Sequence, residues 1–174
     1  MTRSKRLLCS LALLVAVLLV AGPAIAQDGL RAELSRDLAQ IEEKIVGLAD
    51  AIPADKYGWA PEEGVRTVSQ SLMHTATANF FFASMLGVAA PEGLDLRGLE
   101  KVTDKAEVKK LLEQSFDHLG KAIESAEDLT APKSYFGQDG TVAGLLHAGL
   151  SHNHEHLGQM IAYARSNGVK PPWS

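Results

Sequence analysis

Cysteine is almost absent from the sequence. Cys9 is the only one, and it lies in an apolar stretch near the N-terminus. A chain with a single cysteine cannot form an internal disulfide, and without that N-terminal stretch it has neither a thiol nucleophile nor a thiolate metal ligand. Any metal chemistry must therefore rest on histidine and carboxylate side chains.

Clusters of basic residues are also lacking. The chain has 17 Lys and Arg against 21 Asp and Glu, and the basic residues are scattered along it. Nucleic acids and anionic membrane surfaces are bound by clustered Lys and Arg. We therefore expect no nucleic acid and no membrane surface among the partners, and a small molecule as the substrate or ligand.

The N-terminus has the pattern of a secretory signal peptide. Three cations and no acid lie in residues 1–6, residues 7–21 are apolar apart from Ser10, and Ala24-Ile25-Ala26 supplies an A-x-A cleavage site. The alternative is an uncleaved membrane anchor, but the apolar run is shorter than the roughly 20 residues that a spanning helix needs. The sequence predicts a signal peptide over 1–26, export to the periplasm or beyond, and no stable membrane span after cleavage.

Residues 27–174 then form one domain of ordinary size. The signal removes three cations and no acid, so this part carries 14 basic and 21 acidic side chains. Because no useful stretch alternates with period two, we expect no strand.

Four segments have the pattern of amphipathic helices: 28–51, 68–86, 105–127 and 142–166. Glycine or proline lies in each intervening loop. Four such helices in one domain predict an all-α fold, a four-helix bundle, in which sites are built from side chains on facing helices. Apolar residues recur at steps of three and four in the first segment: Leu30, Leu34, Leu38, Ile41, Ile45, Leu48 and Ile52.

Capping patterns define two of the helix starts. Thr67 is followed by Gln70, and Asp104 is followed by Glu107, three residues on in each case. This spacing is typical of the capping box. It predicts that the second and third helices begin directly after Thr67 and Asp104.

The histidines of the last helix lie on different faces. At about 100° per residue, His156 falls inside the apolar arc and His152 at its edge, whereas His147 and His154 fall opposite it. His152 and His156 are i and i+4 neighbours and could chelate one ion together. His147 and His154 are expected in solvent.

The second helix offers a third candidate ligand. His74 has the same relation to the apolar face of residues 68–86 as His152 has to its own helix, whereas His118 lies off the apolar stripe of 105–127 and is expected at the surface. A lone histidine beside an apolar face is more often hydrogen-bonded than metal-bound. Three buried imidazoles with no carboxylate nearby would, however, all be satisfied by one ion.

Three other polar residues of the last helix lie near these histidines. Asn153 falls in the apolar arc, where a buried amide must be hydrogen-bonded, and we expect it to bridge helices or line the site. Gln159, one turn beyond His156, is either a polar partner of a metal-bound histidine or exposed. Glu155 is the nearest acid and a weak candidate for a general base.

Three stretches resemble the DinB-like family of metal-binding four-helix bundles. These are residues 59–74, with Trp59-Ala60-Pro61 leading to His74, the segment HNHEHLGQ at 152–159, and the tail 162–172. The resemblance implies a three-histidine site on His74, His152 and His156. It covers essentially the whole of 27–174. The family often has an arginine at the position of Leu157. A role of that arginine in binding an anion therefore cannot be carried over to this chain.

Several DinB-like proteins are thiol S-transferases or thiol-dependent isomerases. The three-histidine site that the resemblance implies would hold a divalent metal, and imidazole ligands favour Zn, Ni or Fe. Three protein ligands leave coordination positions open. Three hypotheses follow. The first is a metal-dependent hydrolase or transferase with a cavity beside the histidines, and the second is a non-catalytic metal- or ligand-binding envelope protein. The third is a structural bundle whose histidines lie too far apart to share an ion. The apolar excess of residues 68–86 fits core packing, a pocket wall or a homodimer face.

Overall fold

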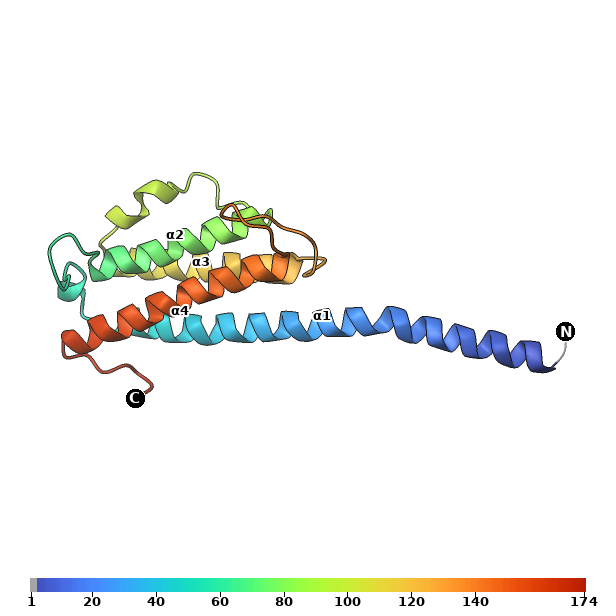
Figure 1. Cartoon of the computed structure of the whole chain (residues 1–174). Helices are drawn as coiled ribbons and strands as arrows, with labels where there is room; N and C mark the ends of the chain where they lie inside the picture. Colours follow the sequence, from blue (N-terminus) through green and yellow to red (C-terminus); the bar gives the residue numbers. More distant parts are fainter. Residues whose placement is uncertain (1–2) are drawn as a thin grey trace.

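The computed structural model describes the backbone of residues 3–174 and the side chains of residues 26–174. Its elements are α1 (Arg3–Ala51), η1 (Ala54–Lys56), α2 (Val68–Met85), η2 (Leu96–Lys101), α3 (Lys105–Ser125) and α4 (Val142–Ser166). No strand occurs among the described residues, which form an all-α bundle as predicted (Figure 1).

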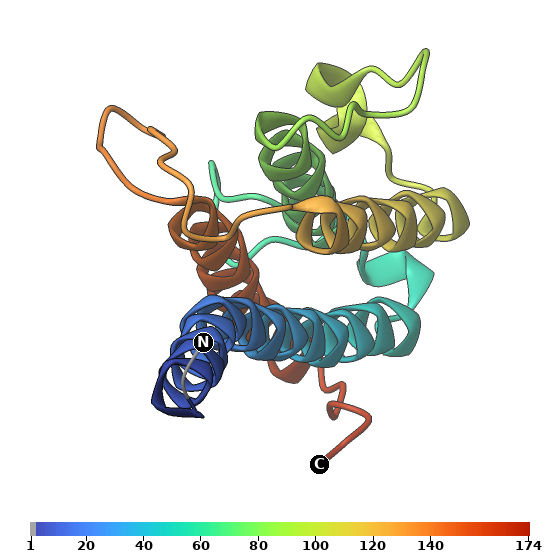
Figure 2. The same ribbon diagram turned by 90° about the vertical axis from the view of Figure 1, so that its right-hand side faces the viewer.

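The helices pack in pairs around one core. Each of α1 and α2 packs against both α3 and α4. Figures 1 and 2 show α2 and α4 running side by side, with the loops that follow α2 and α3 projecting from the bundle. This arrangement places the inner faces of α2 and α4 against each other.

The predicted helix boundaries agree with the structure except at α1. The Thr67–Gln70 capping box at the start of α2 is complete in both directions, and the Asp104 side chain accepts a hydrogen bond from the backbone N–H of Glu107 at the start of α3. The expected start of the first helix at residue 28 was wrong, because α1 begins at Arg3. Leucine and alanine, which fill much of residues 7–21, are strong helix formers and carry the helix through that stretch.

The apolar stripe of α1 enters the core with one exception. The predicted positions from Leu34 to Ile52 are buried, whereas Leu30 is 38% exposed. The short 3-10 helices η1 and η2 were not predicted, because three to six residues give no periodic signal.

The first described side chain of α1 that bonds to another element is Gln27. Its amide donates to Asp128 Oδ1 at 3.1 Å and accepts from the Leu129 N–H at 3.0 Å. Arg31 then donates to the carbonyls of Ile123 and Ala126 at the end of α3. These bonds hold residues 27–31 of α1 against the end of α3 and the loop that follows it.

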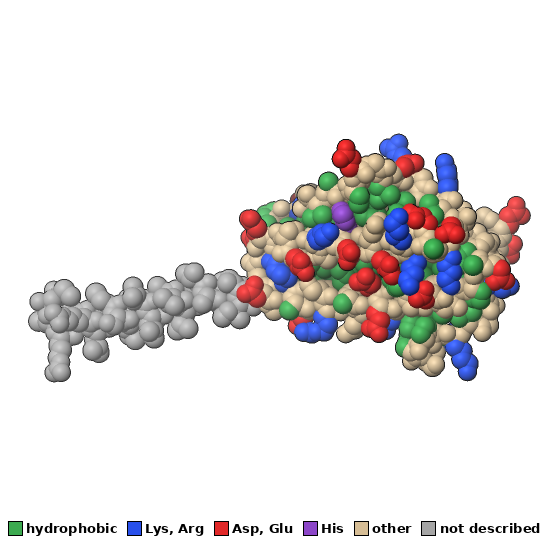
Figure 3. Space-filling view, turned by 180° about the vertical axis from the view of Figure 1, so that it is seen from behind, with side chains coloured by type: hydrophobic (Ala, Val, Ile, Leu, Met, Phe, Trp, Pro, Cys, Tyr) green, Lys and Arg blue, Asp and Glu red, His purple; other side chains and the backbone are tan. Residues whose placement is uncertain are grey.

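No helix among residues 26–174 is long and apolar enough to cross a membrane. On the face shown in Figure 3, acidic and basic side chains are interspersed. The described part of that face therefore carries no extended patch of one charge.

Candidate metal centre

Three histidines meet between α2 and α4. His152 Nε2 lies 3.3 Å from His74 Nε2 and 3.2 Å from His156 Nε2, and all three side chains are partly buried. Each offers a nitrogen within 4.8 Å of the other two. Within residues 26–174, this is the one group of three or more potential metal ligands whose donor atoms come together.

Helix geometry and one buried hydrogen bond bring these rings together. His152 and His156 lie one turn apart on α4, with ring centroids 4.5 Å apart. Asn153 Nδ2 donates to Asn79 Oδ1 of α2 at 2.7 Å, and both amides are fully buried. Because this bond joins residues next to His152 and near His74, it fixes the register of α4 against α2 at the site.

Asn153 therefore bridges helices, which was one of its two expected roles. Asn79 continues the connection, since its Nδ2 donates to Ser115 Oγ of α3 at 3.2 Å. The Ser115 hydroxyl in turn donates to the Leu112 carbonyl. A short polar chain thus crosses the core from α4 through α2 to α3.

A glutamate that the sequence did not single out bonds to His74. Glu100 Oε1 in η2 lies 3.2 Å from His74 Nδ1, and Arg66 Nε donates to both oxygens of the same carboxylate at 3.1 Å. The expectation that no carboxylate lies near the histidines was therefore wrong. Nothing in the local sequence marks Glu100, because it reaches the site through a loop fold and not through helical spacing.

Gln159 bonds to His156, the first of its two expected positions. Its Oε1 lies 2.8 Å from His156 Nδ1, and its Nε2 donates to the Tyr163 hydroxyl at 2.9 Å. Tyr163 donates onward to the Arg66 carbonyl at 3.1 Å, and Trp59 packs edge-on against its ring. Trp59 is therefore a loop residue that packs against Tyr163 of α4.

These partners determine which ring nitrogen carries the proton. A carboxylate only accepts hydrogen bonds, so the proton of neutral His74 is on Nδ1. Because Gln159 donates to Tyr163 through its nitrogen, its oxygen faces His156, whose proton is also on Nδ1. The Nε2 atoms of both rings therefore present lone pairs toward His152.

Burial favours the neutral form of His152 and His74. It is the main cause that lowers the pKa of His152 to about 4, with His156, His74 and Arg66 lowering it further. Burial also lowers the pKa of His74, and Arg66 and His156 act in the same direction, while Glu100 opposes them. Neutral imidazole is the form that binds metals.

The other histidines lie away from this cluster. His147 and His154 are exposed, as expected, and His154 Nε2 is 3.0 Å from Asp37 Oδ1 of α1. His118 lies at the surface but is partly covered: its Nε2 lies 2.8 Å from the Ala89 carbonyl and its ring packs edge-on against Phe80. The loop after α2 covers His118, which helical periodicity alone does not reveal. Glu155 is exposed.

A cavity of about 480 Å³ adjoins the site. It is lined by Gly64, Val65, Arg66, Gln70 and Glu100, and so reaches the cluster through the carboxylate that bonds to His74. None of the three histidines lines this cavity, so it adjoins the cluster only through Glu100. The proximity of the rings contradicts the third hypothesis, in which they lie too far apart to share an ion.

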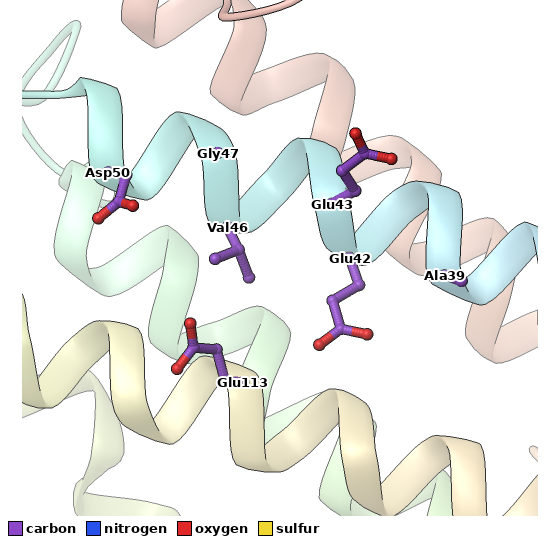
Figure 4. A pocket seen from close by; sticks show the side chains of 7 residues that line it. All are labelled: Ala39, Glu42, Glu43, Val46, Gly47, Asp50 and Glu113. Atoms are coloured by element: carbon purple, nitrogen blue, oxygen red, sulfur yellow. The ribbon is translucent and has the colours of Figure 1, made fainter.

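A second cavity, of about 530 Å³, lies between α1 and α3 and is acidic. Figure 4 shows Glu42 of α1 and Glu113 of α3 extending into the space between the two helices. Burial raises the pKa of Glu42, and Asp117 and Glu113 add to the effect. Lys109 bonds to Asp50 at 2.8 Å and lies 3.9 Å from Glu113, so part of this charge is balanced within the protein.

Comparisons with known proteins give a family match and a shared fold. Residues 37–160 match the model of the DinB superfamily. The fold is similar to crystal structures of DinB-like proteins from Bacillus cereus (TM-score 0.69, 18% identity, covering 80% of this chain and 93% of that one) and Bacillus subtilis (0.63, 22%, 79% and 93%). It is also similar to a conserved protein from Enterococcus faecalis (0.62, 17%, 77% and 94%). A search of curated proteins finds no match.

The lowered pKa of His152 predicts a pH-dependent stability. Below pH 6.5, its ordinary pKa, the His152 side chain is protonated in the unfolded chain, whereas in the folded metal-free chain it stays neutral down to about pH 4. The free energy of unfolding therefore decreases as the pH is lowered through this window. We expect His152 to account for about 1 kcal/mol of the loss between pH 7 and pH 5, after allowing for solvent screening of a partly exposed ring.

Urea unfolding with a chelator present measures this loss. A His152→Gln variant should lose less stability on acidification than the native chain. His147→Gln, which removes an exposed histidine of the same helix, should change nothing. An identical loss in the native chain and His152→Gln would contradict the prediction.

Proposed function

Since the chain belongs to the DinB superfamily, we propose that it binds one divalent transition metal ion on His74, His152 and His156. We further propose that the open coordination positions serve a small-molecule substrate, in a metal-dependent hydrolase or transferase. The observation that carries the proposal is the convergence of the three Nε2 atoms, two of which have their protons held on the opposite nitrogen.

The spacing of these nitrogens fits a shared ion. Two nitrogens bound to one tetrahedral ion at about 2.0–2.1 Å lie about 3.3–3.4 Å apart. The two Nε2–Nε2 distances are 3.3 and 3.2 Å. A hydrogen bond explains the contacts less well, because His152 has one Nε2 proton at most and faces two lone pairs. A cation satisfies all three nitrogens together.

Neutral imidazole ligands suit Zn, Ni or Fe. Such an ion supplies Lewis acidity, which activates water or a thiol at neutral pH. Glu100 and Gln159 would hold two of the ligand rings in orientation. Three protein ligands leave room on the ion for the substrate, as in other catalytic sites.

A non-catalytic metal- or ligand-binding protein is the second candidate. Two observations favour it: Glu155, the weak candidate for a general base, is exposed, and Glu100 is already bonded to both Arg66 and His74. Neither carboxylate is thus a free acid or base at the histidines.

Metal content tests the proposal. Protein purified without a polyhistidine tag and loaded with Zn, Ni or Fe should contain about one ion per chain by elemental mass spectrometry. A His152→Ala/His156→Ala double variant should contain almost none, because one ring alone is a weak ligand set. The matched control, His147→Ala/His154→Ala, removes two exposed histidines from the same helix and should keep the ion. Equal metal contents in all three proteins would overturn the proposal.

Glu100 should raise the affinity for the ion, because it orients His74 and increases the basicity of its ring. A Glu100→Ala variant is expected to bind Zn about 10–100-fold more weakly in a chelator competition assay. Glu100→Gln, which keeps an accepting oxygen, should recover part of the loss. Glu92→Ala, which removes an exposed glutamate from the loop before η2, is the control. Undiminished affinity in Glu100→Ala would remove this carboxylate from the site.

Export is also part of the proposal, with cleavage after Ala26. It is supported by the signal pattern of residues 1–26. Intact mass of the protein isolated from its native host should equal that of residues 27–174. A retained N-terminus in a cytosolic fraction would contradict export.

A further inference from the structure

Three phenylalanines form an aromatic surface beside the candidate metal centre. Phe81 and Phe82 come from α2, and Phe136 comes from the loop between α3 and α4. Phe136 stacks on Phe81 with centroids 6.3 Å apart and lies edge-on to Phe82 at 5.9 Å. We call this group the aromatic platform.

Two of the platform rings are exposed. Phe136 is 63% and Phe81 46% exposed, whereas Phe82 is buried beneath them. Exposed large apolar side chains are common singly, but two that stack on each other from separate elements form a patch, and such patches mark interaction sites. The platform is therefore a candidate binding surface and not a stray exposed residue.

The backbone holds Phe136 in an unfavourable conformation. Its φ is +51° and that of Gly137 is +76°, at the tip of a small turn closed by hydrogen bonds between Tyr135 and Gln138. Asparagine and glycine are favoured where both central residues have positive φ, and a bulky residue is strained there. A phenylalanine at this position costs folding energy and exposes its ring, so folding alone does not explain it.

The platform is continuous with the histidines. The Phe82 ring centroid lies 6.2 Å from that of His152. Phe82 also lies against Gly149 of α4, where a Cβ atom would come within 3.2 Å of its Cγ, so the ring is closely held between α2 and α4. The aromatic platform and His152 are therefore neighbours along the contact between α2 and α4.

Helix spacing sets the distance between platform and site. Phe81 follows His74 by seven residues, which is two turns on the same face of α2 and about 10 Å along the axis. Ala78 lies between them on that face, and the residue one turn before His152 is Ala148, so the side chains between are small. A ligand about 10 Å long could touch both ends.

From this arrangement we infer that the site takes a small molecule with a metal-binding head group and an aromatic or alkyl body, which lies on Phe81 and Phe136. This inference rests on the proposed metal site. It assigns specificity to Phe81 and Phe136, which are not among the three proposed metal ligands.

Two hydroxamates test the inference on the Zn-loaded full chain by calorimetry. Acetohydroxamic acid carries only the head group, and 4-phenylbutanohydroxamic acid adds a phenyl ring on a tether. The aryl compound should bind at least about tenfold tighter, because it buries a ring on the platform. In a Phe81→Gln/Phe136→Asn variant the two affinities should agree within about twofold, with acetohydroxamate unaffected.

The control is Trp173→Gln, which removes an exposed aromatic side chain beside Gly47 of α1 and should keep the full preference. Phe136→Asn should melt no lower than the native chain, since asparagine tolerates this backbone conformation. A fall in affinity for the aryl compound alone would then not reflect unfolding.

The outcomes separate the two proposals. No binding of acetohydroxamate to the Zn-treated native chain would overturn the metal site and the inference with it. Binding of acetohydroxamate with no preference for the aryl compound, or a preference that survives in the variant, would overturn the platform alone. A native dimer that the Phe81→Gln/Phe136→Asn variant converts to monomer in sedimentation would assign the platform to a contact between copies instead.

Discussion

The buried hydrogen bond between Asn153 and Asn79 is the constraint on which the candidate site depends. Helices packed only through apolar side chains can shift along each other at modest cost, whereas a buried amide that loses its partner costs about 1–3 kcal/mol. The 2.7 Å bond therefore fixes one register of α4 against α2. In that register His74 faces His152 and His156.

The polar partners of the histidines act on this fixed frame. Glu100 and Gln159 each accept the Nδ1 proton of one ring, which leaves the Nε2 lone pairs to converge. Arg66 connects both partners, since its side chain bonds to Glu100 and its carbonyl accepts from Tyr163, which holds Gln159. The protein thus uses a network of neutral and charged groups to set the orientation of two rings, the usual means of tuning a metal ligand.

The parts of the fold and the site that could be predicted are those that depend on residue spacing within a single helix. Helical periodicity and capping residues identified the four helices, and the face analysis selected the three histidines that meet, because both depend on spacing within one helix. Glu100 was missed, since a loop and a 3-10 helix bring it to His74 from 26 residues away. The bond of His118 to the Ala89 carbonyl was missed for the same reason, because the loop after α2 leaves no mark on the periodicity of α3. The aromatic platform likewise joins α2 to a distant loop, and no spacing rule relates Phe81 to Phe136.

The most direct test of the account is a crystal structure of the Zn-loaded protein with anomalous diffraction at the zinc edge. The account predicts one zinc ion bound by the Nε2 atoms of His74, His152 and His156 at about 2.0–2.1 Å, with at least one position not filled by the protein. An ion bound through Nδ1, a fourth protein ligand that closes the site, or zinc found only elsewhere would contradict it.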